Sequence, residues 1–352
     1  MRVITQIPNT DLVEAQKLAV IAERAGFDSI ITAENAHGCF LPLAAAALVT
    51  SRIQLGTAVA MAFPRSPTIM AHSAWDLHKA SKGRFYLGLG SQVKAHNERR
   101  FGVPWTPPAP RMRDYIAAVR AVCHAWETET PLDFHSDTYN LTLMTPNFSP
   151  KPTGLPPIPI SIAAVGPAML KLGGEVCDGV RLHPFSTRRY LDEVSITRIG
   201  EGLAKSGRDR RNVEVIAGGY GFIGTGRDAA AVAKARAYVR FRIAFYCSTR
   251  AYWDVLRLHD MEWLGEKVNP LPRQNRWSEM AEQIPEELID LFATVVDYEA
   301  LPEAIAKRYG GSADTVLLQI GPDEDEARLA KCVAAIQAIP APFQGFEKRA
   351  AA

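Results

Sequence analysis

Four side chains that can move or hold a proton follow short apolar segments of this sequence. Glu34 and His37 come just after one such segment, and His96 and His183 follow two others. A carboxylate or an imidazole at a strand end can act as an acid or base, and an imidazole can also hold an anionic group. The alternatives are an arginine-paired carboxylate for Glu34, a surface imidazole for His37 and structural histidines elsewhere. We predict that all four belong to an active site.

The segment 163–169 could bind an anion. A β-branched run ends here, Gly166 permits a tight turn, and Pro167 suits the first position of a helix. The free backbone N–H groups of Ala168 and Met169 at that helix N-terminus could hold a phosphate. From these residues alone, an ordinary strand-to-helix turn is an equally good interpretation.

The sequence lacks the characteristic motifs of several other enzyme classes. The sequence contains no HExxH zinc motif, no GxSxG nucleophile elbow and no GxxxxGK[ST] phosphate loop. Its five cysteines are widely spaced and form no CxxC pair, so neither a disulfide framework nor a zinc cage is encoded. We therefore expect no bound metal. Three aromatic residues are candidates for a substrate pocket, with burial in the core as their alternative: Phe63, Trp75 and Tyr246.

Strand-like segments alternate with amphipathic helices along the whole chain. We predict strands at 3–7, 29–32, 53–61, 85–89, 158–163, 179–182, 213–222 and 315–319. Eight is the strand number of a (β/α)8 barrel, and a last helix at 323–339 closes the ring. A doubly wound open sheet does not demand eight strands. The predicted fold is therefore an α/β fold of the (β/α)8 TIM-barrel type.

We predict a single domain over residues 1–345, followed by a tail at 346–352. Two segments exceed a minimal barrel: 131–157 has the pattern of a hairpin followed by a proline-rich crossing, and 247–285 is rich in tryptophan, proline and arginine. If both follow strands, they are loops of the C-terminal face, where barrel active sites are built. We predict both insertions on that face.

Composition narrows the class of partner. The chain has 352 residues, of which 47% are hydrophobic and 22% are charged, the balance of a globular protein. Its net charge of +2 supplies no field for nucleic acid or an anionic membrane. The longest apolar run, 41–49, is too short to span a bilayer. We predict a cytoplasmic protein that acts on a small molecule and binds neither nucleic acid nor membrane.

Taken in order, several segments resemble luciferase-like monooxygenases, especially the branch that uses the deazaflavin coenzyme F420. The resemblance extends from the first strand to the last helix. It rests on TAENAH at 32–37, LGTAV at 55–59, GRFYLGLGSQVKAH at 83–96, AVGP at 164–167 and GEVCDG at 174–179. What the resemblance implies is a barrel with a flavin or deazaflavin at its C-terminal face.

The resemblance also implies that nine residues at three strand ends hold the cofactor. In the family, the corresponding positions lie at the back of the cofactor ring, at the pyrimidine edge of the ring and at the phosphate. Family members often have a non-proline cis peptide at the first of these positions. These residues are Ala58 and Val59, then Gly90, Ser91 and Gln92, then Ala164, Val165, Gly166 and Met169.

The implied chemistry is hydride transfer between coenzyme F420 and a small organic substrate. The alternative is a flavin mononucleotide (FMN) monooxygenase that uses O2 and receives reduced flavin from a partner reductase. Asn35 and Ala36 stand where the sugar-phosphate dehydrogenase branch has an Asp-His pair, so a sugar phosphate is not the expected substrate. The family also implies a homodimer.

Overall fold

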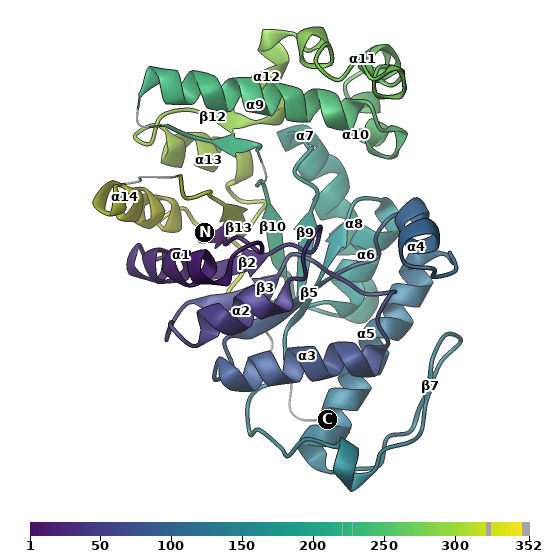
Figure 1. The fold of residues 1–352 in the computed structure, drawn as a ribbon. Coiled ribbons are helices and arrows are strands. Elements are labelled where there is room, and N and C mark those ends of the chain that lie inside the picture. Colours follow the sequence, from purple (N-terminus) through teal and green to yellow (C-terminus); the bar gives the residue numbers. More distant parts are fainter. Residues whose placement is uncertain (220, 227, 322–324, 347–352) are drawn as a thin grey trace.

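A computed structural model describes residues 1–219, 221–226, 228–321 and 325–346. Within them, eight parallel strands close into a barrel, because the last strand pairs with the first. In order around the barrel (Figure 1) they are β1 (Arg2–Gln6), β2 (Ser29–Thr32), β3 (Gln54–Thr57), β5 (Phe85–Gly90), β8 (Ile160–Ala164), β9 (Gly179–Leu182), β10 (Glu214–Ala217) and β13 (Thr315–Leu317). The predicted (β/α)8 barrel is confirmed.

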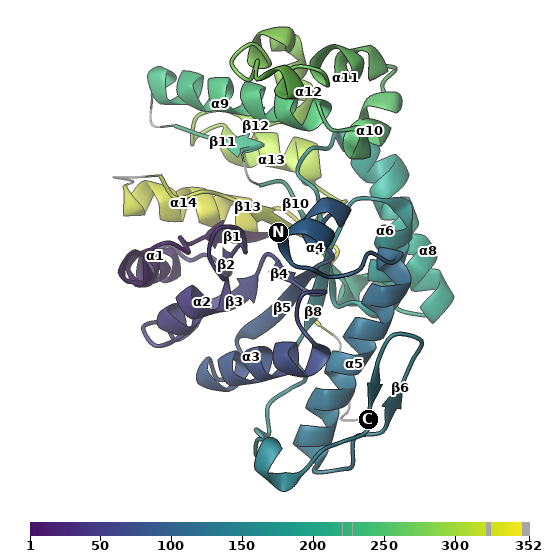
Figure 2. The ribbon, with the colours of Figure 1, turned by 45° about the vertical axis from the view of Figure 1, so that its right-hand side comes forward.

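Helices cover the outside of this barrel (Figure 2). Asp11, Ser66 and Asp325 start three of them, since each side chain accepts a backbone N–H bond from the first turn. Within the described residues, no helix combines the length and the apolar character needed to cross a bilayer. The helices before β10 are α1 (Leu12–Arg24), α2 (Phe40–Ala47), α3 (Pro67–Ala80), α4 (Lys94–Arg100), α5 (Pro108–Thr128), α6 (Pro167–Val176), α7 (Arg188–Tyr190) and α8 (Thr197–Ser206), and α13 (Leu301–Tyr309) and α14 (Glu326–Gln337) lie before and after β13.

Polar side chains close one end of the barrel. Arg2 and Glu214 enter its interior from β1 and β10, and their side chains pair at 2.5 Å. Thr315 of β13 donates its hydroxyl to the same carboxylate at 2.5 Å. These residues lie at the N-terminal ends of their strands, so they form a floor. The opposite, C-terminal end is the mouth of the barrel.

The predicted third strand, 53–61, is divided in the structure. β3 ends at Thr57, and β4 (Ala60–Met61) continues along β5 after a bulge. The predicted seventh strand, 213–222, is shorter than expected, because β10 ends at Ala217. The chain therefore leaves the barrel wall at both places, close to the mouth.

The long insertion on the mouth side lies between β10 and α13. It contains β11 (Ile223–Gly224), α9 (Ala229–Cys247), α10 (Trp253–Arg257), α11 (Glu262–Val268), α12 (Ile289–Phe292) and β12 (Thr294–Val295), and so extends well beyond the predicted 247–285. Its apolar residues form a separate core that also includes Phe185 and Tyr190, which follow β9. Figure 1 shows the insertion in green beside α13. It therefore packs against the exit of β9.

The predicted placement of 131–157 on the C-terminal face is wrong. This segment follows α5 and precedes β8, so it connects a helix to a strand and lies at the N-terminal end of the barrel. The predicted hairpin is present as β6 (Phe134–His135) and β7 (Asn140–Leu141). Figure 2 shows it alongside α5, far from the insertion. The sequence pattern identified the hairpin but not the end of the barrel at which it lies.

The GEVCDG motif at 174–179 has a structural role. A Cβ on Gly174 would lie 2.1 Å from the Ile199 carbonyl oxygen, so only glycine lets α6 and α8 approach so closely. Glu175 pairs with Arg113 of α5 at 2.6 Å and with Lys205 of α8 at 2.9 Å. The motif therefore joins three helices of the outer layer.

Glu175 is expected to make stability depend on acidic pH. The hydrogen bonds from Arg113 hold the pKa of Glu175 at about 2, below the usual 4.5, and Lys205 adds to this effect. Between these values the unfolded chain binds more protons, so the stabilisation is complete above about pH 4.5 and is lost as the pH falls toward 2. Urea unfolding of wild type and Glu175→Gln from about pH 5 to pH 3 measures this contribution.

The wild-type unfolding free energy should fall more steeply with acidification than that of Glu175→Gln. Glu14→Gln is the matched control, because Glu14 forms an exposed pair with Lys17 on α1. This control should follow the wild-type curve. Parallel curves for wild type and Glu175→Gln would show that the three-helix contact does not favour the ionised carboxylate.

Candidate active site at the barrel mouth

Four of the predicted segments come together at one side of the mouth. β4 pairs with β5 through Met61 and Gly90, and β5 pairs with β8 through Leu89 and Ile162. β8 pairs in turn with β9, where the residue opposite Ala164 is Leu182. The bulge after β3, the exit of β5, the turn after β8 and the exit of β9 are therefore consecutive around the mouth.

The bulge presses directly onto β5. The Ala58–Val59 peptide bond is cis, and the Ala58 N–H donates to the Thr32 carbonyl oxygen at 2.7 Å. A Cβ built on Gly90 would lie 2.5 Å from Val59 Cγ2. Glycine at position 90 therefore allows the Val59 side chain to lie against the end of β5.

The exit of β5 is held by backbone contacts. Gln92 has a φ of 57° and accepts the Val93 N–H on its own side-chain oxygen at 2.9 Å. The Asn97 amide donates to the Ser91 carbonyl oxygen at 2.9 Å. Ser91 and Gln92 are half-buried. These contacts fix the backbone that was predicted to meet the edge of the cofactor ring.

The turn after β8 leaves backbone donors at a helix start. Gly166 is the N-cap of α6, and no side chain caps this helix end. Met169, one of the two predicted donors, uses its N–H inside the turn, because it donates to the Gly166 carbonyl oxygen at 3.1 Å. Within the described residues, the N–H groups of Gly166 and Ala168 donate to no acceptor, and Val165 is exposed. The turn can therefore hold a phosphate through these two groups.

His183 lies at the exit of β9 between two tyrosines. Its ring stacks on Tyr252 at 4.3 Å between centroids and meets the edge of Tyr246 at 4.5 Å. The Phe185 N–H donates to His183 Nδ1 at 3.2 Å, so the neutral ring carries its hydrogen on Nε2. Burial, together with the smaller effect of the Arg242 charge, lowers the pKa of His183 to about 3. At neutral pH this side chain is a hydrogen-bond donor rather than a cation.

Glu34 is engaged in an ion pair. Its carboxylate pairs with Arg65 at 2.5 Å and accepts the Met61 backbone N–H at 2.8 Å. Arg65 also donates to the Met61 carbonyl oxygen at 3.1 Å. This is the arginine pair named above as the alternative for Glu34, and it ties the exit of β2 to the end of β4. The structure thus shows how Glu34 positions the bulge.

His37 is exposed on the loop that follows β2, and His96 is exposed on α4, the helix after β5. Asn9 holds the first loop, because its amide donates to the Ala33 carbonyl oxygen at 2.8 Å. Arg100 of α4 donates to the Asn35 carbonyl oxygen at 2.6 Å, so this helix contacts the loop after β2. Neither imidazole has the buried setting of His183.

The three aromatic pocket candidates lie in different places. Tyr246, on α9, packs against His183 at the mouth. Phe63 is buried behind β4, where Arg111 lies 4.4 Å from its ring centroid. Trp75, on α3, packs edge to face with Trp126 of α5 outside the barrel. Only Tyr246 therefore adjoins the residues brought together at the mouth.

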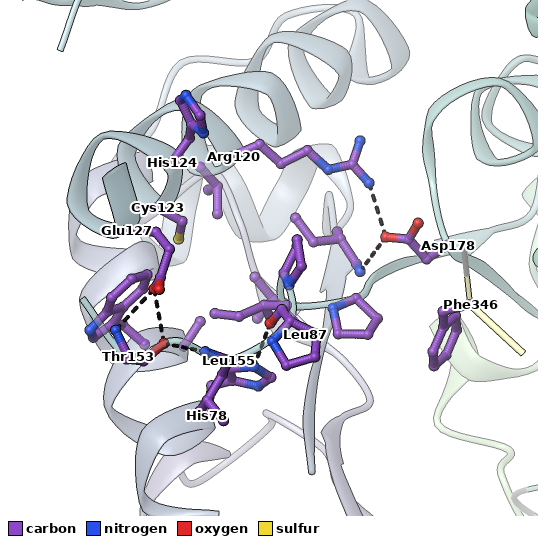
Figure 3. Close-up of a pocket in the computed structure, with 18 of the residues that line it drawn as sticks. His78, Leu87, Arg120, Cys123, His124, Glu127, Thr153, Leu155, Asp178 and Phe346 are labelled. Carbon is purple, nitrogen blue, oxygen red and sulfur yellow. Dashed lines mark hydrogen bonds and ion pairs between the residues drawn. The ribbon is translucent and has the colours of Figure 1, made fainter. Parts of the chain in front are cut away.

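Trp75 lines a cavity of about 380 Å³ between α3, α5 and the segment before β8. The close-up in Figure 3 shows polar residues around it, and their hydrogen bonds are made within the protein. Arg120 pairs with Asp178 at 3.0 Å, and Glu127 accepts the Thr153 hydroxyl at 2.9 Å. The remaining lining is mostly apolar. This cavity is thus a separate apolar space outside the barrel.

Sequence reasoning missed three polar side chains near the mouth. Arg65 anchors Glu34, Arg242 of α9 donates to the Tyr246 hydroxyl at 2.5 Å, and Arg181 of β9 lies in the barrel wall. Arg181 carries a detectable signal, since an arginine between Val180 and Leu182 interrupts an apolar strand.

Within the described residues, no group of three or more His, Cys, Asp or Glu side chains could hold a metal ion.

Comparison with known proteins identifies relatives along nearly the whole chain. A family model described as luciferase-like monooxygenase matches residues 3–315. An uncharacterized protein of Mycobacterium tuberculosis is 44% identical over 311 residues, covering 88% of this chain and 91% of the relative. A second protein of that organism, whose name provisionally assigns it as a coenzyme F420-dependent oxidoreductase, is 31% identical over 334 residues, with coverage of 90% and 93%.

Solved structures share the fold at low sequence identity. The coenzyme F420-dependent tetrahydromethanopterin reductase of Methanopyrus kandleri aligns with a TM-score of 0.76 and 21% identity over 96% of this chain and 97% of that chain. The oxygenating constituent of 3,6-diketocamphane monooxygenase from Pseudomonas putida, in complex with FMN, aligns with a TM-score of 0.63 and 17% identity over 96% and 97%.

Proposed function

Because this chain belongs to the luciferase-like monooxygenase family, we propose that it is an oxidoreductase that binds coenzyme F420 at the barrel mouth. The bound deazaflavin supplies a carbon centre that accepts or donates a hydride, and the substrate is a small organic molecule. The relative named for coenzyme F420 supports this choice, since it is 31% identical over 90% of this chain.

One observation carries the proposal: three backbone features that could each contact part of a cofactor lie next to one another along one side of the mouth. The bulge at Ala58–Val59 offers a surface for a flat ring, the exit of β5 offers a fixed backbone edge, and the turn at Gly166 offers free N–H groups. Consecutive strands place these features in the order ring, edge and phosphate. A ring system with a phosphorylated side chain fits this order.

The protein's own groups would orient the reactants and exclude water. The Glu34–Arg65 pair holds the bulge against β5. His183 can donate its Nε2 hydrogen to a carbonyl or hydroxyl oxygen of the substrate, and Tyr246 and Tyr252 enclose its ring. A neutral imidazole suits this role, because it donates a hydrogen bond without bringing a second cation beside Arg242.

Equilibrium binding tests the proposal. Purified protein is titrated with coenzyme F420 and with FMN, each oxidised and reduced, and fluorescence quenching reports the dissociation constant. We expect coenzyme F420 to bind at least tenfold more tightly than FMN. Tighter binding of FMN would reject the deazaflavin proposal and direct the search to oxygen-consuming reactions with a partner reductase.

A substitution at Gly166 tests the phosphate turn. The φ of −87° at Gly166 is close to the range of proline, and a Cβ there meets no atom within 4 Å, so Gly166→Pro should fold normally. It removes one of the two free N–H groups. We expect the dissociation constant of coenzyme F420 to rise about tenfold, the value of one hydrogen bond to a charged group.

The phosphate-free deazaflavin chromophore is the control ligand for this variant. Its affinity should be the same for wild type and Gly166→Pro, because it makes no phosphate contact. An equal loss for both ligands would mean that the turn shapes the ring site instead of holding the phosphate.

A further inference from the structure

Arg181 lies inside the barrel wall, below the mouth. The flanking residues of β9, Val180 and Leu182, pack outward into the core beneath the helices. Successive strand residues point to opposite faces, so the Arg181 side chain points into the barrel. The pKa of Tyr86, another residue of the barrel interior, agrees with this direction. Burial raises the pKa of Tyr86, and the nearby charge of Arg181 opposes that rise.

The guanidinium group of Arg181 lacks a partner. Its Nε and Nη2 atoms are buried, and within the described residues they form no hydrogen bond and no ion pair. The Ser161 hydroxyl, on the neighbouring strand β8, is also buried and has no hydrogen-bond partner among the residues that the structure describes. Arg2 differs, because this interior arginine has Glu214 at 2.5 Å. Arg2 also has Asp28 at 4.0 Å, whereas no carboxylate in the described part of the chain forms an ion pair with Arg181.

An unpaired buried cation destabilises a fold, because it gives up hydration without gaining an interaction in return. Such a cost is typical of binding sites, where a ligand supplies the missing partner. The position of Arg181 suits a ligand entering through the mouth. In the register of the two strands, Arg181 lies opposite Ala163 of β8. Ala163 comes one residue before the turn at 164–169. The Arg181 side chain is half-buried, so part of it reaches accessible space.

We propose that Arg181 is an anion-binding residue beneath the mouth, which binds an anionic oxygen of the ligand that occupies the site. The identity of the ligand rests on the proposed function. Two sources share this chemistry: the pyrimidine edge of the reduced deazaflavin, which gathers negative charge, and a carboxylate group of the substrate. In both cases the ligand supplies the partner that the folded chain does not provide, and the neighbouring Ser161 hydroxyl can add a hydrogen bond.

The first measurement is thermal unfolding of the ligand-free protein. Arg181→Met keeps the length of the side chain and removes its charge, so the melting temperature should stay the same or rise. Arg2→Met is the matched control inside the same barrel. It leaves Glu214 buried without its cation, so its melting temperature should fall. If Arg181→Met melts as early as Arg2→Met, Arg181 has a structural role and the proposal fails.

The second measurement is ligand binding by wild type, Arg181→Lys and Arg181→Met. We expect Arg181→Met to lose about 10- to 100-fold in affinity for an anionic ligand, and Arg181→Lys to recover part of it. A loss confined to reduced coenzyme F420 assigns the cofactor edge. A loss of the melting-temperature rise produced by acetate assigns a substrate carboxylate.

Unchanged affinity for reduced coenzyme F420, together with an unchanged acetate effect, would overturn the proposal. The proposed function can fail separately. If wild type binds neither coenzyme F420 nor FMN, the deazaflavin assignment is lost, whereas the unfolding comparison and the acetate titration still decide whether Arg181 is an anion site.

Discussion

Replacement of His183 by alanine is expected to lower kcat about 100- to 1,000-fold, the usual effect of removing one well-placed hydrogen-bond donor from an active site. The expected cause is loss of the Nε2 hydrogen, which the Phe185 N–H fixes by occupying Nδ1. The affinity for the cofactor should change much less than kcat, since His183 is proposed to donate to the substrate and is not one of the nine predicted cofactor residues. Steady-state kinetics and fluorescence titration measure the two effects.

His135→Ala is the matched control, because this imidazole is exposed on the β6–β7 hairpin, away from the mouth. Turnover should remain close to wild type in this variant. An unchanged kcat in His183→Ala with a lowered melting temperature would contradict the proposed role. It would show that the imidazole only fills the space between Tyr246 and Tyr252.

The state of the His183 ring predicts a pH dependence. Burial lowers its pKa to about 3, below the usual 6.5, so lowering the pH protonates this ring only near pH 3. The donor at Nε2 is therefore present throughout the neutral range. We therefore expect His183 to cause no step near pH 6.5 in the pH profile of kcat. A step there that is present in wild type and absent in His183→Ala would contradict this. NMR titration of the imidazole tests the same point directly, with His183→Ala used to assign its signal.

Gly90→Ala is expected to weaken binding of coenzyme F420 by about 10- to 100-fold. The added Cβ lies 2.5 Å from Val59 Cγ2, so the valine must shift, and overpacking of this kind costs about 1–3 kcal/mol. The shift displaces the bulge from the position that the ring is proposed to contact. Fluorescence quenching with wild type and variant measures the change in the dissociation constant.

The double variant Gly90→Ala with Val59→Ala tests this cause. Removing Val59 Cγ2 makes room for the new Cβ, so the double variant should bind better than Gly90→Ala alone. Val59→Ala by itself shows what the valine contributes to binding. If the double variant binds no better than Gly90→Ala, the loss arises somewhere other than at this contact.

Most of the fold could be predicted, because its signals are local. Alternating apolar segments and helix-starting residues such as Ser66 identified the eight strands and their connecting helices. Errors arose in placing two segments relative to the barrel. The segment 131–157 was expected on the C-terminal face, but it follows α5 and therefore lies at the other end. The insertion after β10 is larger than 247–285, because α9 belongs to it.

The site was predicted less completely, because its chemistry depends on distant partners. Glu34 was identified at a strand end, but its partner Arg65 lies 31 positions further along the chain. The pKa of His183 depends on burial and on Arg242 in the insertion. The turn after β8 was identified from its residues as a candidate anion site, whereas the bulge and the exit of β5 were identified only through the family resemblance. The assignment of all three to a cofactor stays a prediction.

The amino-acid sequence by itself determined the order of strands and helices, since backbone preferences and apolar periodicity act over a few residues. Tertiary structure decided which end of the barrel is closed, which strand ends adjoin and which charges remain unpaired. Arg2 and Arg181 show the physical reason. Both are arginines in barrel strands, but the closed barrel gives Arg2 the carboxylate of Glu214 and, within the part of the chain that the structure describes, gives Arg181 none.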